Sequence, residues 1–190
     1  MLGLLSATDP RWVQVALGDL DAVLLDHFHC ELKAASSALA LAARYPSDPR
    51  RVQALTELAR EELTHVQQAS EVLASRGLVP GPPGEDSYAR ELRRVARTAP
   101  SEHLLDRLLL GSVIEARSCE RLLLLSQAVP DEALRRWYGA LYASEARHHR
   151  VFAALAEDAA GAGRARERLG ELCALEAEVL AGLPVLPRIH

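Results

Sequence analysis

Aromatic residues are scarce in this sequence, at 4% of its 190 positions. A core with few large rings must be filled by Leu, Ala and Val. That composition is typical of helices, whereas β-sandwiches favour β-branched and aromatic side chains. Hydrophobic residues make up 49% and charged residues 25%, which is ordinary for a globular chain. Length and composition together predict one all-α domain over residues 1–190.

Cysteine is also scarce: the chain has three, and no two of them form a CxxC pair. This argues against a disulfide framework, a zinc ribbon and a rubredoxin-type iron site. The N-terminus lacks the cationic start and apolar run of a signal peptide. No stretch approaches the roughly 18 uninterrupted apolar residues of a membrane span. We therefore expect a soluble, cytoplasmic protein without a membrane partner.

Turn signals divide the chain into helices, with Asp-Pro pairs at two expected starts and Gly-rich or Pro-rich segments at the ends. The expected bundle helices cover about 10–45, 49–76, 102–127 and 131–160. A crossover over 78–101 contains a short helix at about 86–98, and a C-terminal helix covers about 164–181. Two antiparallel hairpins joined by one long crossover are the connectivity of a ferritin-like four-helix bundle.

Two of the expected helices carry a Glu-x-x-His motif, and each of the other two carries a Glu with apolar residues on both sides, Glu31 and Glu115. This is the ligand set of ferritin-like di-iron and di-manganese proteins, because carboxylates can bridge two cations and imidazole is a good iron ligand. At i and i+3, the Glu and His of a motif lie on one helical face. The candidate ligands of two iron ions are Glu31, Glu62, His65, Glu115, Glu145 and His148.

The spacing of the candidate ligands supports this interpretation. Glu31 and Glu62 are 31 positions apart, and Glu115 and Glu145 are 30 apart. Residues at one height in an antiparallel hairpin are equidistant from its turn, and these midpoints fall near Pro46 and Pro130, which are independent turn signals. The alternative is four solvated glutamates. Burying four carboxylates without a metal would be prohibitive.

Other polar residues lie near the candidate ligands in sequence. Glu61 and Ser144 each directly precede a Glu-x-x-His motif, a position from which a side chain could orient a ligating His. Simple surface exposure is the alternative for Glu61. Further residues are expected to have packing or surface roles: His27, His29, His149, Cys30 and Cys119.

Three segments around the candidate ligands, 29–36, 114–121 and 144–148, read HCELKAAS, IEARSCER and SEARH. They resemble the tRNA-(2-methylthio-N6-isopentenyladenosine) hydroxylase family, and the similarity extends from about residue 10 to 180. The resemblance implies a di-iron monooxygenase that uses O2 to hydroxylate the isopentenyl group of a modified adenosine next to the anticodon. It also implies an external reductase or ferredoxin-type electron donor, because the chain has no flavin or iron–sulfur motif.

A tRNA substrate requires a basic face, although the net charge of the whole chain is −4. In the expected short helix, four arginines at i, i+3, i+4 and i+7 would form one stripe. The alternative is a solvated surface in a chain whose 22 basic residues include a single Lys. The candidate RNA-binding residues are Arg90, Arg93, Arg94 and Arg97.

The same ligand set is compatible with other functions, because fold alone does not choose the chemistry. One alternative is another ferritin-like redox protein, such as a rubrerythrin-like peroxide reductase. A second is an iron-handling protein, which as a store would form a large hollow oligomer. A third is a metal-free helical interaction module, which would bind no iron.

Overall fold

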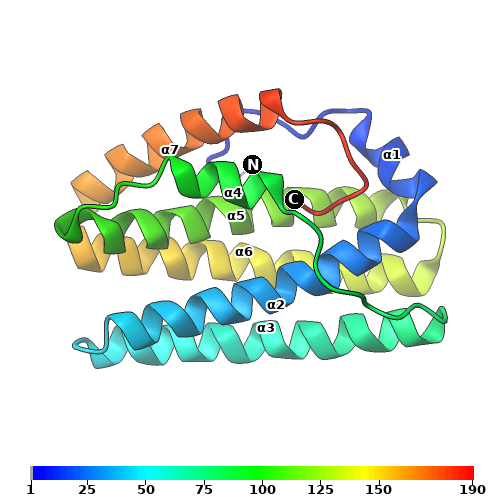
Figure 1. Cartoon of the computed structure of the whole chain (residues 1–190), viewed down its shortest axis with the longest axis horizontal. Coiled ribbons are helices and arrows are strands. Elements are labelled where there is room, and N and C mark those ends of the chain that lie inside the picture. Colours follow the sequence, from blue (N-terminus) through cyan, green and yellow to red (C-terminus); the bar gives the residue numbers. More distant parts are fainter. Residues whose placement is uncertain (1) are drawn as a thin grey trace. The chain divides into compact units, whose positions relative to one another are not determined.

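The computed structural model describes residues 2–190, which form seven helices and no strand (Figure 1). The helices are α1 (Trp12–Gly18), α2 (Leu20–Arg44), α3 (Pro49–Ser75), α4 (Ser87–Arg94), α5 (Pro100–Ala128), α6 (Glu132–Ala160) and α7 (Ala162–Gly182). The all-α prediction is confirmed. Over the same residues, no helix combines the length and the hydropathy needed to cross a membrane.

The helices belong to two compact units. One unit, called here the α2–α3 unit, comprises residues 15–85 and 186–189. In it, α2 and α3 form an antiparallel hairpin (Figure 1). The other, the α5–α6 unit, comprises residues 2–14, 86–185 and 190. Its central hairpin is α5 and α6, against which α7 packs, and α4 contacts α7 and α5. The segment that connects the two hairpins contains α4, so the expected long crossover is present.

The turn and cap residues act as the sequence predicts. Asp48 accepts a hydrogen bond from the backbone N–H of Arg50 at 3.0 Å, and Asp131 accepts one from that of Leu134 at 2.9 Å. Each carboxylate therefore caps the second helix of a hairpin. Gly77 follows α3 with φ +70°, a left-handed conformation that glycine adopts without strain at a helix end.

One expected helix, over residues 10–45, is two helices in the structure. α1 ends at Gly18, and Asp19 begins α2 by accepting the N–H of Ala22 at 3.1 Å. Gly is a poor helix former, and a short acidic side chain competes for backbone donors at this point. The break leaves α2 as a separate 25-residue helix that carries Glu31.

The short helix α4 also differs from expectation, because it ends at Arg94 rather than near residue 98. The reason is tertiary. Asp106 on α5 is fully buried and accepts the backbone N–H of Arg97 at 2.7 Å and its guanidinium at 2.6 Å. Arg168 on α7 donates to the same carboxylate at 2.7 Å. Arg97 therefore lies beyond α4 and fastens the end of the crossover to α5.

A second buried ion pair fixes α4 and α7 to α5. Arg117 donates through Nε and Nη2 to the two oxygens of Glu176, each at 2.9 Å, and both side chains are fully buried. The hydroxyl of Tyr88 on α4 donates to Glu176 at 3.0 Å. Two parallel bonds to one carboxylate give a defined geometry. Arg117 lies two residues after Glu115, so this network restrains the part of α5 that carries a candidate ligand.

The Asp106 cluster predicts a pH dependence of stability. Burial alone would raise the pKa of Asp106, but the hydrogen bonds from Arg168 and Arg97 outweigh it and lower the pKa from 3.8 to about 2. A carboxyl whose pKa is lower in the folded state stabilises the fold above its unfolded pKa. That stabilisation is lost as the pH falls through about 2. The shift corresponds to about 2 kcal/mol.

We therefore expect Asp106→Asn to reduce the free energy of unfolding by at least about 2 kcal/mol at pH 7. The difference from the wild type should shrink between pH 4 and pH 2, as measured by urea denaturation. Asp158→Asn, at an exposed position of α6, is the matched control and should change little. A difference that stays constant over this pH range would contradict the ionised state assigned to Asp106.

Candidate metal centre

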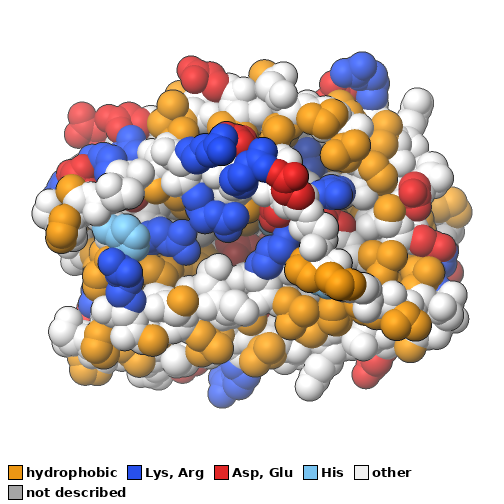
Figure 2. Space-filling view, viewed as in Figure 1, with side chains coloured by type: hydrophobic (Ala, Val, Ile, Leu, Met, Phe, Trp, Pro, Cys, Tyr) orange, Lys and Arg blue, Asp and Glu red, His pale blue; other side chains and the backbone are white. Residues whose placement is uncertain are grey.

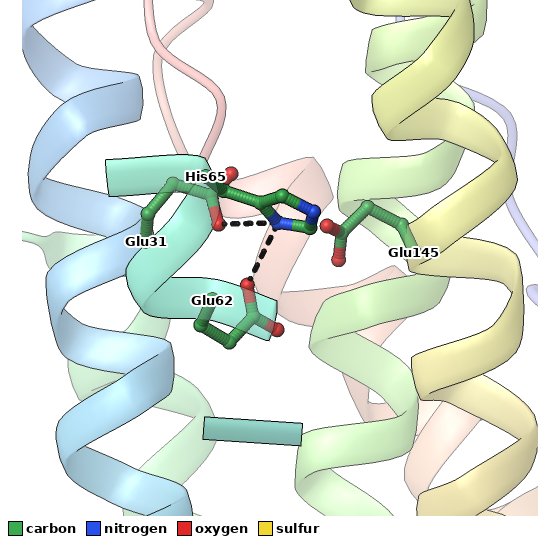
Figure 3. Close-up of side chains that lie close together, drawn as sticks. All are labelled: Glu31, Glu62, His65 and Glu145. Atoms are coloured by element: carbon green, nitrogen blue, oxygen red, sulfur yellow. Dashed lines mark hydrogen bonds and ion pairs between the residues drawn. The ribbon is translucent and has the colours of Figure 1, made fainter. Parts of the chain in front are cut away.

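In the α2–α3 unit, Glu31, Glu62 and His65 converge from neighbouring helices (Figure 3). His65 Nδ1 lies 3.3 Å from Glu31 Oε2 and 3.1 Å from Glu62 Oε2. The three residues are 5%, 0% and 7% exposed. Each offers a ligand atom within 4.8 Å of the other two. The predicted hairpin register is therefore confirmed here, and it produces a buried trio of two carboxylates and one imidazole.

His27 supports this trio, a role that the sequence analysis missed. Its Nε2 lies 2.6 Å from Glu31 Oε1, and the His27 side chain is 1% exposed. Position 27 precedes Glu31 by four residues, so the two side chains lie on the same face of α2. This i,i+4 spacing was the feature of the sequence that could have predicted the contact between His27 and Glu31. An imidazole N–H that donates to a carboxylate fixes its rotamer and leaves its other oxygen for a ligand.

In the α5–α6 unit, the corresponding trio is Glu115 on α5 with Glu145 and His148 on α6. Each offers a ligand atom within 4.8 Å of the other two, and His148 Nδ1 lies 3.6 Å from Glu145 Oε2. All three are buried, at 5%, 2% and 2% exposure. This trio repeats the composition of the first one.

Two other contacts report the register of α5 against α6. Ser112 Oγ lies 2.9 Å from His149 Nδ1, and Cys119 Sγ lies 3.6 Å from the carbonyl oxygen of Tyr142. Both pairs are centred between residues 130 and 131, the predicted turn. The Ser112 contact also shows that His149 is a buried packing residue, as expected.

The donor set of each trio suits a metal ion. Carboxylate oxygens and imidazole nitrogens are ligands of iron, manganese and zinc. Glutamates with so little exposure would be costly to keep ionised in an apolar interior, and a bound cation offsets that cost. One helix of each hairpin supplies a Glu and the other a Glu-x-x-His motif. The residues present therefore fit a carboxylate-rich metal site.

The two residues that precede the motifs have different surroundings. Glu61 is half-buried on α3. Ser144 is buried at 5% exposure, and its Oγ accepts a hydrogen bond from Arg147 Nη2 at 3.0 Å. A role for either residue in orienting a ligating His stays a prediction.

The arginines proposed to contact RNA lie in the α5–α6 unit, where basic side chains gather over α4 (Figure 2). Arg90 and Arg94 both pair with Glu91, at 2.9 and 2.8 Å. Arg93 is exposed. The fourth arginine of the expected stripe, Arg97, lies beyond α4 and is held by Asp106, so the helical stripe has three members. RNA contact by these residues stays a prediction.

All three cysteines are buried, which agrees with the small core residues expected at Cys30 and Cys119. Burial, reinforced by the nearby Glu145 carboxylate, raises the pKa of the Cys119 thiol to about 12. Burial likewise raises the pKa of the Cys173 thiol. Both groups remain protonated thiols at neutral pH.

The contact between His27 and Glu31 yields a test that does not depend on turnover. We expect His27→Ala to weaken Co(II) binding by tenfold to a hundredfold, because the ligand carboxylate loses the donor that orients it. His27→Gln, which keeps an N–H donor, should recover part of the affinity. The readout is competition against a chromophoric chelator. His103→Ala serves as the control, and an affinity loss equal to that of His27→Ala would contradict the role of His27.

A curated protein of Pseudomonas putida, named tRNA 2-(methylsulfanyl)-N(6)-isopentenyladenosine(37) hydroxylase, is 41% identical over 151 residues, which cover 80% of this chain and 73% of that protein. A protein of Salmonella typhimurium with the same name is 29% identical over an alignment 201 positions long. The alignment covers 81% of this chain and 72% of the relative.

A solved structure described as protein 43 with aldehyde deformylating oxygenase activity, from Synechococcus, is 38% identical. It superposes with a TM-score of 0.93 and covers 98% of this chain and 94% of its own. The ferritin-like fold predicted from the sequence is confirmed. The model of the family described as tRNA-(MS[2]IO[6]A)-hydroxylase (MiaE) matches residues 3–190. The chain therefore belongs to the tRNA-(MS[2]IO[6]A)-hydroxylase family.

Proposed function

We propose that this protein hydroxylates the isopentenyl group of 2-methylthio-N6-isopentenyladenosine in tRNA, at the nucleotide next to the anticodon. The observation that carries the proposal is the repeated buried trio in a chain of this family. Each hairpin supplies two carboxylates and one imidazole, and the two named relatives are hydroxylases of this nucleoside.

The two trios together would hold two iron ions. Their summed composition, four glutamates and two histidines from four helices, is the ligand set of di-iron carboxylate proteins. A bound iron pair supplies the ability to activate O2. The protein's own contribution is to hold six ligands in a water-poor interior, with His27 fixing Glu31 and the Arg117 network restraining the α5 segment around Glu115.

The balance of the reaction defines the partners. One oxygen atom of O2 enters a C–H bond of the isopentenyl group, and the other leaves as water. This requires two protons and two electrons. The chain has no flavin or iron–sulfur motif, so the electrons come from an external reductase or ferredoxin-type donor. The RNA would meet the arginines of α4, where Arg93 and Arg94 are exposed.

Iron content is the first test. The purified full-length chain, reconstituted anaerobically with Fe(II), should bind two iron ions per chain by elemental analysis. Glu62→Ala should reduce this number because it removes a fully buried donor. Glu57→Ala, on the same helix and exposed, should leave it unchanged. Protein that stays iron-free would instead support the metal-free interaction module.

Nucleoside mass spectrometry tests the reaction itself. The chain would be expressed in cells that make the prenylated, methylthiolated adenosine but lack the hydroxylase. We expect that nucleoside in digested tRNA to gain one oxygen atom. Glu115→Ala should abolish the gain, and Glu132→Ala, at an exposed position of α6, should preserve it. An iron-loaded protein with a competent reductase and no oxygenated nucleoside would overturn the proposal.

The Synechococcus relative supplies a second candidate function, because it is 38% identical and is described as having aldehyde deformylating oxygenase activity. In this second candidate function, the same ligands would act on an aldehyde. Incubating the iron-loaded protein with an aldehyde and a reductant, and looking for the shortened hydrocarbon, separates the two. Hydrocarbon without nucleoside oxygenation would favour the second candidate.

A further inference from the structure

The α2–α3 unit contains a cavity of about 370 Å³ that the proposed reaction does not use. One wall is α2, a second is the glycine- and proline-rich loop after α3, and the third is the chain segment 186–188. The lining residues are Ala22, Leu25, Asp26, His29, Lys33, Gly81, Pro82, Gly84, Leu186, Pro187 and Arg188. The volume falls at the small end of the range for ligand pockets, which is roughly 300 to 1,000 Å³.

The cavity is separate from the candidate metal ligands. His29 and Lys33 each lie two positions from Glu31, which at about 100° per residue places them on the opposite side of α2. Glu31 points toward Glu62 and His65 (Figure 3). The wall formed by α2 is therefore the outer side of the hairpin, behind the buried trio.

Defined contacts hold the third wall in place. The backbone N–H of Ile189 donates to Asp26 Oδ2 at 2.8 Å, and Ile189 is 1% exposed. Arg188 donates through Nη1 to the carbonyl oxygen of Glu85. Segment 186–189 is thus bound to α2 through Ile189 and to the loop after α3 through Arg188. These hydrogen bonds define the third wall of the cavity.

The charges that line the cavity favour an anion. Lys33 and Arg188 are cationic, and Asp26 is the one acidic residue of the lining. The Asp26 carboxylate already accepts the Ile189 N–H at 2.8 Å and the Cys30 thiol at 3.6 Å. The lining residues therefore carry two cationic side chains and one carboxylate, a formal net charge of +1.

Lys33 is unusual in this chain, because it is the single Lys among 22 basic residues. Lys presents a compact point charge, whereas Arg presents a planar fork. Lys33 lies in the wall of a defined cavity, where a compact positive charge suits a contact with one small anionic group such as a phosphate.

The rest of the lining suits a flat, weakly polar group. His29 offers an imidazole ring, and Leu25, Leu186 and the two prolines offer apolar surface. Proteins that bind single-stranded RNA combine backbone-contacting cations with flat side chains, His included, on which bases stack. A nucleotide carries both a phosphate and a base.

We propose that this cavity binds one nucleotide of the RNA substrate, with its phosphate at Lys33 and Arg188 and its base against His29 and Leu186. The proposal rests on the proposed function, because it assumes an RNA substrate. It adds a contact on α2, away from the α4 arginines and from the metal ligands.

The test is RNA affinity measured by fluorescence anisotropy, with the full-length iron-loaded chain and a labelled anticodon stem-loop RNA over a range of salt concentrations. We expect Lys33→Ala to weaken binding about tenfold at low salt. The slope of log affinity against log salt should fall by about 0.7 to 0.9, the value of one lost phosphate contact. Lys33→Arg should recover the slope. Arg60→Ala, an exposed arginine of α3 in the same unit, is the matched control.

The outcomes separate this proposal from the proposed function. Equal losses for Lys33→Ala and Arg60→Ala, with tRNA still hydroxylated, would overturn the nucleotide site and leave the function intact. A wild-type chain that neither binds the stem-loop nor modifies tRNA would overturn both. Adenosine monophosphate that binds the wild type but not Lys33→Ala, while RNA affinity is unchanged, would identify a free-nucleotide site and overturn the RNA contact. An iron content for Lys33→Ala equal to that of the wild type establishes that the variant is folded.

Discussion

Carboxylates buried inside helices impose the main constraint on this chain. Glu62 is fully buried and Glu145 is 2% exposed, in helices whose other buried residues include Leu, Ala and aromatic side chains. Such groups are tolerated where a cation and hydrogen-bond donors compensate them. The same rule applies away from the trios, since Asp106 is matched by Arg97 and Arg168, and Glu176 by Arg117. Each buried acid therefore has a defined compensating group, or a ligand set that a metal would complete.

The hairpin turns and the pairing of the candidate ligands could be predicted from the sequence, because they depend on residues close to one another along the chain. The caps at Asp48 and Asp131 and the glycine at position 77 act within a few residues of their own positions, so sequence alone located the hairpin turns. Once the turns were fixed, equal distances from them paired the candidate ligands. His27 was missed, although its i,i+4 spacing to Glu31 was visible, because a lone His on a helix is more often a packing residue.

The errors lie where tertiary contacts override local preference. Nothing near Arg97 in the sequence indicates that Asp106, nine positions later, takes both its backbone N–H and its guanidinium. α4 therefore ends earlier than its charge pattern suggests. The cavity behind α2 was equally invisible, because its third wall comes from residues more than 150 positions away from the helix it covers.

The protonation of Cys119 has a consequence for its reactivity toward oxidants. A thiol is oxidised by peroxide as its thiolate, and Cys119, four residues after Glu115, has a pKa of about 12. At neutral pH roughly one such group in 10⁵ is deprotonated. Sulfenic acid formation at this position is therefore slow. The burial that surrounds Glu115 and Glu145 therefore also keeps this nearby sulfur in its unreactive thiol form.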